Sequence, residues 1–254
     1  MPIMNQMMRW LGVELSAVSG REKMISAIGG FVALVALTVI CERWLKLEHA
    51  EALVCSMGAS AVLLFGVPHG PLAQPWPVIA GHGLSAFIGV CCAKFFGVSM
   101  VSAALAVGTS IGVMHQLKCI HPPGGASALI AVMGGASIQK MGFHFVWCPV
   151  LLNAVVMVGV AVAFNFAFGW RRYPVVWADK AKVEPVDEAT HLRIVAALRD
   201  MDSFVDISEE DLVRLAHGIL AERPGLPAMI RNLNEDDRND AFADDEGLAH
   251  TVRP

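Results

Sequence analysis

The chain has 254 residues, of which 55% are hydrophobic and 17% charged, and its formal net charge is −4. This composition excludes an ordinary soluble domain, in which about a quarter of the residues are charged. It also offers no strongly basic face, which excludes a nucleic-acid-binding protein. A lipid bilayer is therefore the expected environment.

The first part of the chain predicts a cytoplasmic segment followed by a retained membrane anchor. Residues 1–22 are of mixed character and lack a short apolar core with a small-residue cleavage site, so we expect no signal peptide. Four apolar runs reach the roughly 20 residues that cross a bilayer, and they cover residues 24–41, 76–97, 99–117 and 145–170. Basic residues flank the first and last runs and favour cytoplasmic termini; they are Arg21, Lys23, Arg171 and Arg172.

Two shorter apolar segments, residues 52–67 and 122–137, are rich in small residues. They fit tilted short spans, broken helices or re-entrant segments, so four and six crossings both remain open. Each contains the sequence Gly-Ala-Ser-Ala, which starts at Gly58 and at Gly125. Because each segment follows one long run and precedes another, we predict a duplicated three-segment unit, inverted if all six segments cross.

Small residues recur every fourth position in two of the long runs, as Gly81, Ser85 and Gly89 and as Ala104, Gly108 and Gly112. Such stripes let helix backbones approach each other closely. We expect both stripes to serve packing within the bundle rather than a dimer seam. A homo-oligomer remains open.

The character changes to that of soluble helices after Tyr173-Pro174. Apolar side chains fall on one side of residues 188–201, and a second helix is predicted to begin at Ser208, whose hydroxyl can cap it. We therefore expect a cytoplasmic helical module over residues 174–225, with a partner that the sequence does not identify. Residues 226–254 are acidic, and we expect them to be disordered.

The sequence His121-Pro122-Pro123-Gly124-Gly125 interrupts a region that is almost free of charge. From Ala52 to Trp170 the only charged side chains are Lys94, Lys118 and Lys140. A helix that starts near Gly125 would direct N–H groups and a partial positive charge at a small anion. The glycines would let backbone approach the ligand, and Ser127 could add a hydroxyl donor. The related segment with Gly58 and Ser60 would supply a second, facing helix N-terminus.

Two histidines accompany this break. Ionisable side chains inside a membrane are costly and face the protein interior or a water-filled cavity. His121 would either line the pathway or lock the loop through a structural hydrogen bond. His82, early in the third long run, is the second candidate.

Catalysis and metal binding are not expected. No carboxylate lies in the apolar region to orient a histidine, so a Ser-His-Asp constellation has no third member. The spacing of His82, His115, His121 and Cys119 matches no helix-borne pair of metal ligands, and the six cysteines show no CxxC pattern. We therefore predict no enzyme, no cofactor, no bound metal and free thiols. The missing acids disfavour cation transport and favour an anion or a neutral solute.

These motifs resemble the HPP family of integral membrane proteins. The resemblance rests on His121-Pro122-Pro123 with the following Gly-Gly-Ala-Ser-Ala, on Gly58-Ala59-Ser60-Ala61, on Pro71 to Pro75 leading to Gly81-His82, and on Arg171-Arg172-Tyr173-Pro174. It covers roughly residues 20–177. It implies at least four membrane helices and, because plant and cyanobacterial relatives have been linked to nitrite transport, a small-anion permease.

The sequence thus predicts an all-α, polytopic membrane helix bundle over residues 23–173, with four long spans and two short or broken segments. We expect a transporter or channel for a small monovalent anion, with nitrite as the leading substrate, bound at the short-helix N-termini near the membrane midplane. The binding residues would be His121, Pro122, Pro123, Gly124, Gly125, Ser127, Ser60, Gly58 and His82. The expected location is a bacterial inner membrane with both termini in the cytoplasm. The alternative is a membrane-embedded sensor or scaffold whose cytoplasmic helices bind a partner.

Overall fold

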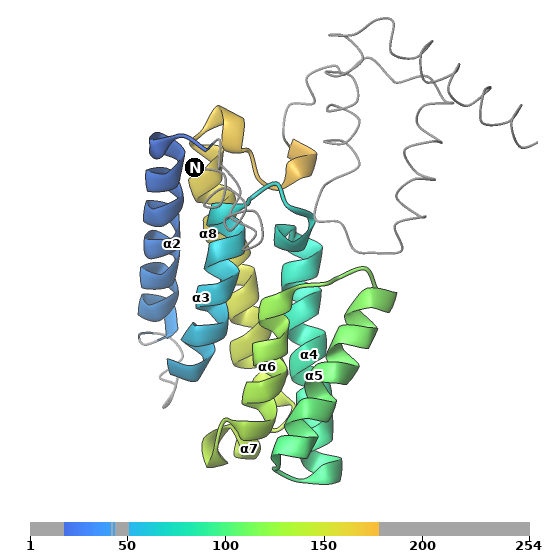
Figure 1. The fold of residues 1–254 in the computed structure, drawn as a ribbon. Helices are drawn as coiled ribbons and strands as arrows, with labels where there is room; N and C mark the ends of the chain where they lie inside the picture. Colours follow the sequence, from blue (N-terminus) through green and yellow to red (C-terminus); the bar gives the residue numbers. More distant parts are fainter. Residues whose placement is uncertain (1–17, 42, 44–50, 178–254) are drawn as a thin grey trace, which may run out of the picture. The chain divides into compact units, whose positions relative to one another are not determined.

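The computed structural model describes residues 18–41, 43 and 51–177, and its regular structure there is entirely helical (Figure 1). The expected all-α fold is therefore confirmed for this part of the chain. The predicted helices beyond residue 177 and the first 17 residues lie outside the described ranges. The main helices are α2 (Gly20–Ile40), α3 (Glu51–Gly66), α4 (Pro75–Phe96), α5 (Met100–Gln116), α6 (Pro122–Met133), α7 (Ala136–Met141) and α8 (Leu152–Phe166).

Among the described residues, three helical stretches are long and apolar enough to cross a membrane: α2, α4 and Val146–Phe166, which joins the π-helical turn η3 (Val146–Leu151) to α8. The fourth predicted long span is α5, which has 17 residues, and α6 has 12. At 1.5 Å per residue these two helices measure about 26 Å and about 18 Å, less than the roughly 30 Å of a hydrocarbon core. The number of crossings remains a prediction.

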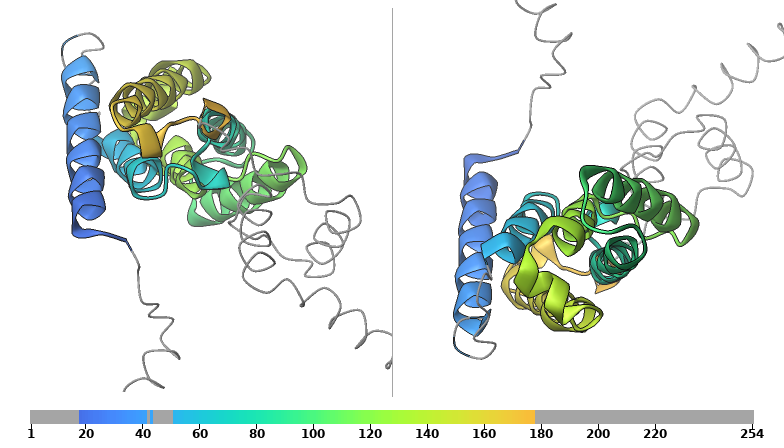
Figure 2. Two further views of the ribbon diagram at one scale, coloured as in Figure 1. Left: turned by 90° about the horizontal axis from the view of Figure 1, so that it is seen from above. Right: turned by 90° about the horizontal axis from the view of Figure 1, so that it is seen from below.

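Direction alternates along the chain from α2 through α3, α4, α5 and α6 to α8, with the short α7 left aside (Figure 1). The series α2, α3, α4 starts from one end of the bundle, and the series α5, α6, α8 starts from the opposite end. This is the arrangement that an inverted duplication requires, although the repeat itself remains a prediction. Views along the bundle place α6 in the middle, with α3 on one side and α4 and α5 on the other (Figure 2).

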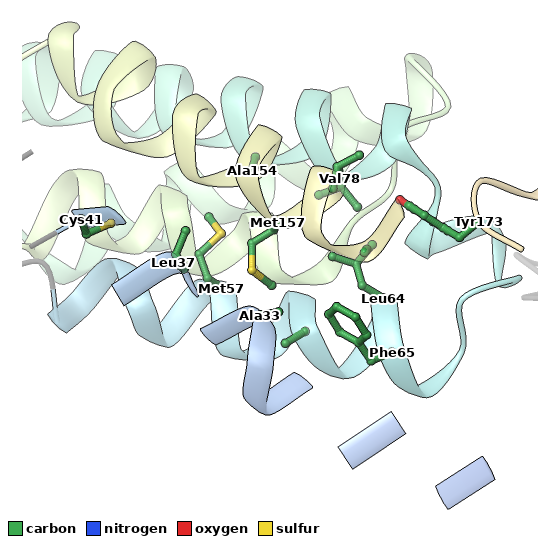
Figure 3. Packing of buried hydrophobic residues seen from close by; sticks show 13 residues of the cluster. Ala33, Leu37, Cys41, Met57, Leu64, Phe65, Val78, Ala154, Met157 and Tyr173 are labelled. Atoms are coloured by element: carbon green, nitrogen blue, oxygen red, sulfur yellow. The ribbon is translucent and has the colours of Figure 1, made fainter. Parts of the chain in front are cut away.

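One hydrophobic core joins α2, α3 and α8 and includes Val78 of α4 (Figure 3). Its members range in size from alanine to tyrosine, and the flexible side chains of Met57 and Met157 can fill irregular gaps between them. They include Ala33, Leu37, Met57, Leu64, Phe65, Val78, Ala154 and Met157. On the outward faces large apolar side chains such as Phe31, Phe87 and Phe95 are exposed, which suits contact with lipid.

The small-residue stripe on α4 serves close packing, as expected. A Cβ atom at Gly89 would lie 2.6 Å from the carbonyl oxygen of Ala128 on α6, and one at Gly81 would lie 2.7 Å from Cβ of His121. The same expectation was wrong for the stripe on α5. Gly108 and Gly112 are exposed and have nothing within 4 Å of an added Cβ, because α5 buries the face that carries Ala103, Ala106 and Ser110 instead.

The end of the bundle where α8 finishes is held by a buried arginine. The Arg171 guanidinium forms an ion pair with Glu22 of α2 and donates hydrogen bonds to Phe65 O at 2.6 Å, Asn165 Oδ1 at 3.1 Å and Ser26 Oγ at 3.2 Å. Only 1% of Arg171 is exposed. It therefore joins α2, α3 and α8, and it satisfies a carbonyl that the last turn of α3 leaves without an intrahelical donor.

Arg171 is one of the basic residues on which the predicted orientation of the termini rests, and in the folded bundle it is paired. Its guanidinium pairs with the Glu22 carboxylate and donates to the carbonyl group of Phe65 inside the fold. The cytoplasmic placement of both termini remains a prediction.

Tyr173 secures the neighbouring loop. Its hydroxyl donates to Ala73 O at 2.8 Å, and the ring is fully buried. Gln74 continues the contact, because its Oε1 accepts from the N–H of Val175 and its Nε2 donates to Pro68 O and Gly70 O. The Arg-Arg-Tyr-Pro motif thus fastens the end of α8 to the α3–α4 loop.

Candidate functional site

Four of the polar residues singled out from the sequence meet in the interior of the bundle. Ser60 comes from the middle of α3, His82 from the second turn of α4, His121 from the N-cap of α6, and Ser127 from the second turn of α6. All four have 0% exposed surface. We call them the His–Ser cluster.

The side chains of the His–Ser cluster are joined by short contacts. Ser60 Oγ lies 2.8 Å from His82 Nε2 and 2.9 Å from His121 Nε2, and the two imidazole centroids are 4.9 Å apart. His82 Nδ1 lies 2.8 Å from Ser127 Oγ. His121 Nδ1 lies 2.9 Å from the carbonyl oxygen of Leu72, in the turn before α4. Every ring nitrogen of the two histidines therefore has a partner.

Two glycines bring α6 close enough to α4 for these contacts. A Cβ atom at Gly81 would lie 2.7 Å from Cβ of His121, and one at Gly124 would lie 2.7 Å from the carbonyl oxygen of Gly81. Any larger residue at either position would move His121 away from α4. Because Gly81 lies six residues after the start of α4, the break before α6 lies about 9 Å along that helix from its first residue.

The first turn of α6 offers fewer hydrogen-bond donors than the sequence suggested. The helix begins at Pro122 and not near Gly125, and neither Pro122 nor Pro123 has an N–H group. The N–H of Gly124, expected to meet a ligand, donates to His121 O at 2.8 Å. Pro123 and Gly124 are buried, Gly125 is half-buried and Pro122 is exposed.

The expected second helix N-terminus at Gly58 and Ser60 was wrong. Helix α3 begins at Glu51, so both residues lie well inside it. Small residues are compatible with a helix interior, and no proline breaks this segment as Pro122 and Pro123 break the other one. Gly58 is half-buried and an added Cβ there would contact nothing within 4 Å. Ser60 belongs to the site through its hydroxyl rather than through a helix end.

The remaining polar residues of the apolar region are structural where the structure describes their bonds. Gln139 of α7 donates to Ala131 O and Val132 O at the end of α6, which satisfies carbonyl groups beside the α6–α7 break. Asn165 Nδ2 donates to Leu64 O. The sequence did not predict the contact of His121 with the Leu72 carbonyl, because a backbone carbonyl group can belong to any residue type. It also did not predict that Arg171 is buried.

The arrangement suits proton exchange and hydrogen bonding. Imidazole and hydroxyl groups both donate and accept protons. No Asp or Glu occurs between Ala52 and Trp170, so a positive charge on either histidine would have no carboxylate partner from α4 to α8. A small anion is the complementary charge.

Comparison with known proteins agrees with a membrane location. The model of a family described as HPP, transmembrane region, matches residues 15–174. The chain is also similar to two proteins of Dictyostelium discoideum that are described as transmembrane proteins. One is 39% identical over 154 residues, which are 59% of this chain and 54% of the relative. The other is 37% identical over 175 residues, which are 66% of this chain and 56% of the relative. The chain thus spans about half the length of these relatives, and no solved structure matches it. With its apolar helices and its His-Pro-Pro segment at the start of α6, the chain belongs to the HPP family of integral membrane proteins.

Proposed function

We propose that the protein carries a small monovalent anion across the membrane, with nitrite as the leading substrate. The His–Ser cluster would be the polar binding site on the path of this anion. The observation that supports this most is the meeting of Ser60, His82, His121 and Ser127 from three helices, α3, α4 and α6, in the interior of the bundle. A stable apolar bundle does not need four buried polar side chains at one point, since each is costly to remove from water.

The charged groups available near the His–Ser cluster favour an anion over a cation as the transported ion. An ion in a low-dielectric interior must be balanced by an opposite charge nearby. The lysines of this region are exposed, unlike the buried cluster, with Lys94 in the last turn of α4, Lys118 in the α5–α6 loop and Lys140 in α7. A protonated His82 or His121 is therefore the positive charge available to an anion. A cation would find no carboxylate.

This pairing makes transport electrically balanced. An anion that meets a protonated histidine forms a neutral pair, which is equivalent to moving the weak acid. Nitrite is the conjugate base of such an acid, and the nitrite transport linked to plant and cyanobacterial family members supports the same choice. The cluster is fully buried in this conformation, so passage requires α3 or α6 to move away from α4.

The remaining expectations belong to the same proposal. The protein would reside in a bacterial inner membrane with both termini in the cytoplasm, and its cytoplasmic tail would meet a partner. We propose transport rather than catalysis, with no cofactor and no resident metal.

Nitrite flux into proteoliposomes tests the proposal. Wild-type protein should give flux above empty liposomes, and His121→Ala and Ser127→Ala should lower the rate at least about tenfold, the factor for roughly 1.4 kcal/mol. Two matched controls should keep the wild-type rate. Ser110→Ala removes a buried hydroxyl that bonds only its own helix at Ala106 O, and His115→Ala removes an exposed histidine at the end of α5.

The outcomes separate the alternatives. No flux of nitrite or other small anions from the wild type would overturn transport and favour the membrane-embedded sensor or scaffold. Wild-type rates in all four variants would keep transport but remove the His–Ser cluster from the path.

A further inference from the structure

The carbonyl group of Leu72 fixes where the protons of the His–Ser cluster lie. A carbonyl oxygen only accepts hydrogen bonds, so the contact of 2.9 Å from His121 Nδ1 to Leu72 O requires a proton on Nδ1. In neutral His121, Nε2 then carries no proton and can only accept a hydrogen bond. Its partner there is Ser60 Oγ at 2.9 Å. The other acceptor within reach of the Ser60 hydroxyl, Ser56 O, is farther away at 3.3 Å, and so the Ser60 hydroxyl donates to His121.

The rest of the order follows from one proton per hydroxyl. Since the Ser60 hydroxyl proton points to His121, Ser60 Oγ must accept from His82 Nε2 at 2.8 Å. Neutral His82 then has a bare Nδ1, which accepts from the Ser127 hydroxyl at 2.8 Å. The four hydrogen bonds therefore all point the same way, from Ser127 through His82, Ser60 and His121 to Leu72 O. A single backbone acceptor sets both tautomers.

We propose that this polarised chain is a proton relay, which takes up a proton at Ser127 and holds it on His121. The role of this relay rests on the proposed function, because the relay would supply the positive charge that accompanies the anion. It assigns different roles to the two histidines. His121 holds the charge, and His82 passes the proton on.

The relay balances at each step. A weak oxoacid, the protonated form of the anion, gives its proton to a lone pair of Ser127 Oγ, while the original hydroxyl proton of Ser127 passes to His82 Nδ1. The Nε2 proton of His82 passes to Ser60 Oγ, and the Ser60 hydroxyl proton passes to His121 Nε2. Ser127, His82 and Ser60 have each gained and lost one proton and stay neutral. The anion is left at Ser127, and His121 is an imidazolium.

The surroundings favour His121 as the final holder. As an imidazolium it donates from Nδ1 to Leu72 O and from Nε2 to Ser60 Oγ, so both of its N–H groups have an acceptor. A charge-assisted bond to a carbonyl dipole is stronger than a neutral one. Helices α4, α5, α6 and α8 carry no carboxylate. The buried Cys119 is the nearest other titratable side chain along the chain, and the Glu22 carboxylate pairs with Arg171 at the end of the bundle.

Nitrogen-15 NMR of histidine-labelled protein in liposomes tests the order of protons directly, with the two rings identified through contacts to labelled serine. At neutral pH the wild type should carry the proton of His121 on Nδ1 and that of His82 on Nε2. On acidification the second proton should appear first on His121. A resting His82 protonated on Nδ1, or a first imidazolium on His82, would overturn the relay.

A second experiment measures nitrite-driven proton uptake in variants of Ser60, the serine that joins the two rings. Ser60→Ala should lower the rate of uptake at least about tenfold. Ser60→Thr keeps a hydroxyl group and should retain most of the wild-type rate, and so should the Ser110→Ala control. Equal proton uptake in Ser60→Ala and wild type would overturn the relay while leaving transport standing. Absence of wild-type nitrite flux together with the expected tautomers would overturn the proposed function and leave the proton order standing.

Discussion

Ser60 and Ser127 bind opposite ring nitrogens of the same histidine, the first at Nε2 and the second at Nδ1 of His82, both at 2.8 Å. The two serines occupy the same place in the two Gly-Ala-Ser-Ala segments. They reach His82 from helices that lie on either side of it in sequence, α3 and α6, which also pack against each other. Two segments with the same Gly-Ala-Ser-Ala sequence thus contribute a hydroxyl group to one imidazole.

The close contact of α4 with α6 makes Gly89 intolerant of a larger residue. Gly89→Ala would place Cβ 2.6 Å from both Ala128 O and Cβ of Ala131, and the strain should cost about 1–3 kcal/mol. In a thermal unfolding measurement in detergent, Tm should fall by several degrees, at about 2–4 °C per kcal/mol.

Gly108→Ala is the matched control, because the added Cβ meets nothing within 4 Å. Alanine is favoured over glycine in a helix by about 0.5–1 kcal/mol, so Tm should stay level or rise. An equal loss of Tm in both variants would contradict close α4–α6 packing as the cause.

The buried guanidinium of Arg171 should be among the most sensitive positions in the bundle. Arg171→Ala removes the partner of Glu22 and the donors to Phe65 O and Asn165 Oδ1, and breaking a buried pair in this way costs about 3–5 kcal/mol. Arg171→Lys should recover only part of this, because one ammonium does not reproduce the planar fork.

The neighbouring Arg172 provides the comparison in the same unfolding measurement. Its guanidinium lies 4.7 Å from the ring centroid of Phe166, a contact worth about 0.5–1 kcal/mol at an exposed site. If Arg172→Ala proves as damaging as Arg171→Ala, the buried network is not what holds this end of the bundle.

The hydroxyl of Tyr173, the only tyrosine of the chain, gives a direct optical readout of the same end. Burial raises the pKa of Tyr173 above its ordinary value, so the folded protein should show no phenolate absorbance near pH 10, where unfolded protein titrates. The folded state needs the neutral phenol, so this contribution to stability is complete below about pH 10 and is lost as the pH rises toward the folded pKa.

Tyr173→Phe should remove that pH-dependent part of the stability. It also leaves Ala73 O without its donor at 2.8 Å, which should cost about 1–3 kcal/mol at neutral pH. Titration of the folded wild type near pH 10 would show that the hydroxyl is open to water.

The polar members of the site can be recognised from the sequence because they stand out in an apolar region. Ser60, His82, His121 and Ser127 are all candidates on that ground alone, and all four meet. Their partners cannot be read in the same way. Which hydroxyl faces which ring nitrogen depends on how α3, α4 and α6 pack, and the Leu72 carbonyl that orders the protons has no residue-type signature.

Helix boundaries and charge placement are harder to read from the sequence. The break before α6 is visible because proline marks it, whereas the start of α3 was wrongly predicted because Gly58 carries no equivalent mark. Arg171 has the position of a surface charge, since a basic residue after an apolar run usually is one. Only the folded arrangement brings Glu22, Ser26 and Asn165 within its reach.

The pair of Glu22 and Arg171 also has a consequence for biogenesis. Glu22 lies in the first turn of α2, and Arg171 follows α8, so synthesis of every intervening helix separates the two charges in time. Glu22 lacks this partner until Arg171 has been synthesised. A ribosome that stalls before residue 171 therefore leaves α2 and α3 without the contact that fastens them to the last helix.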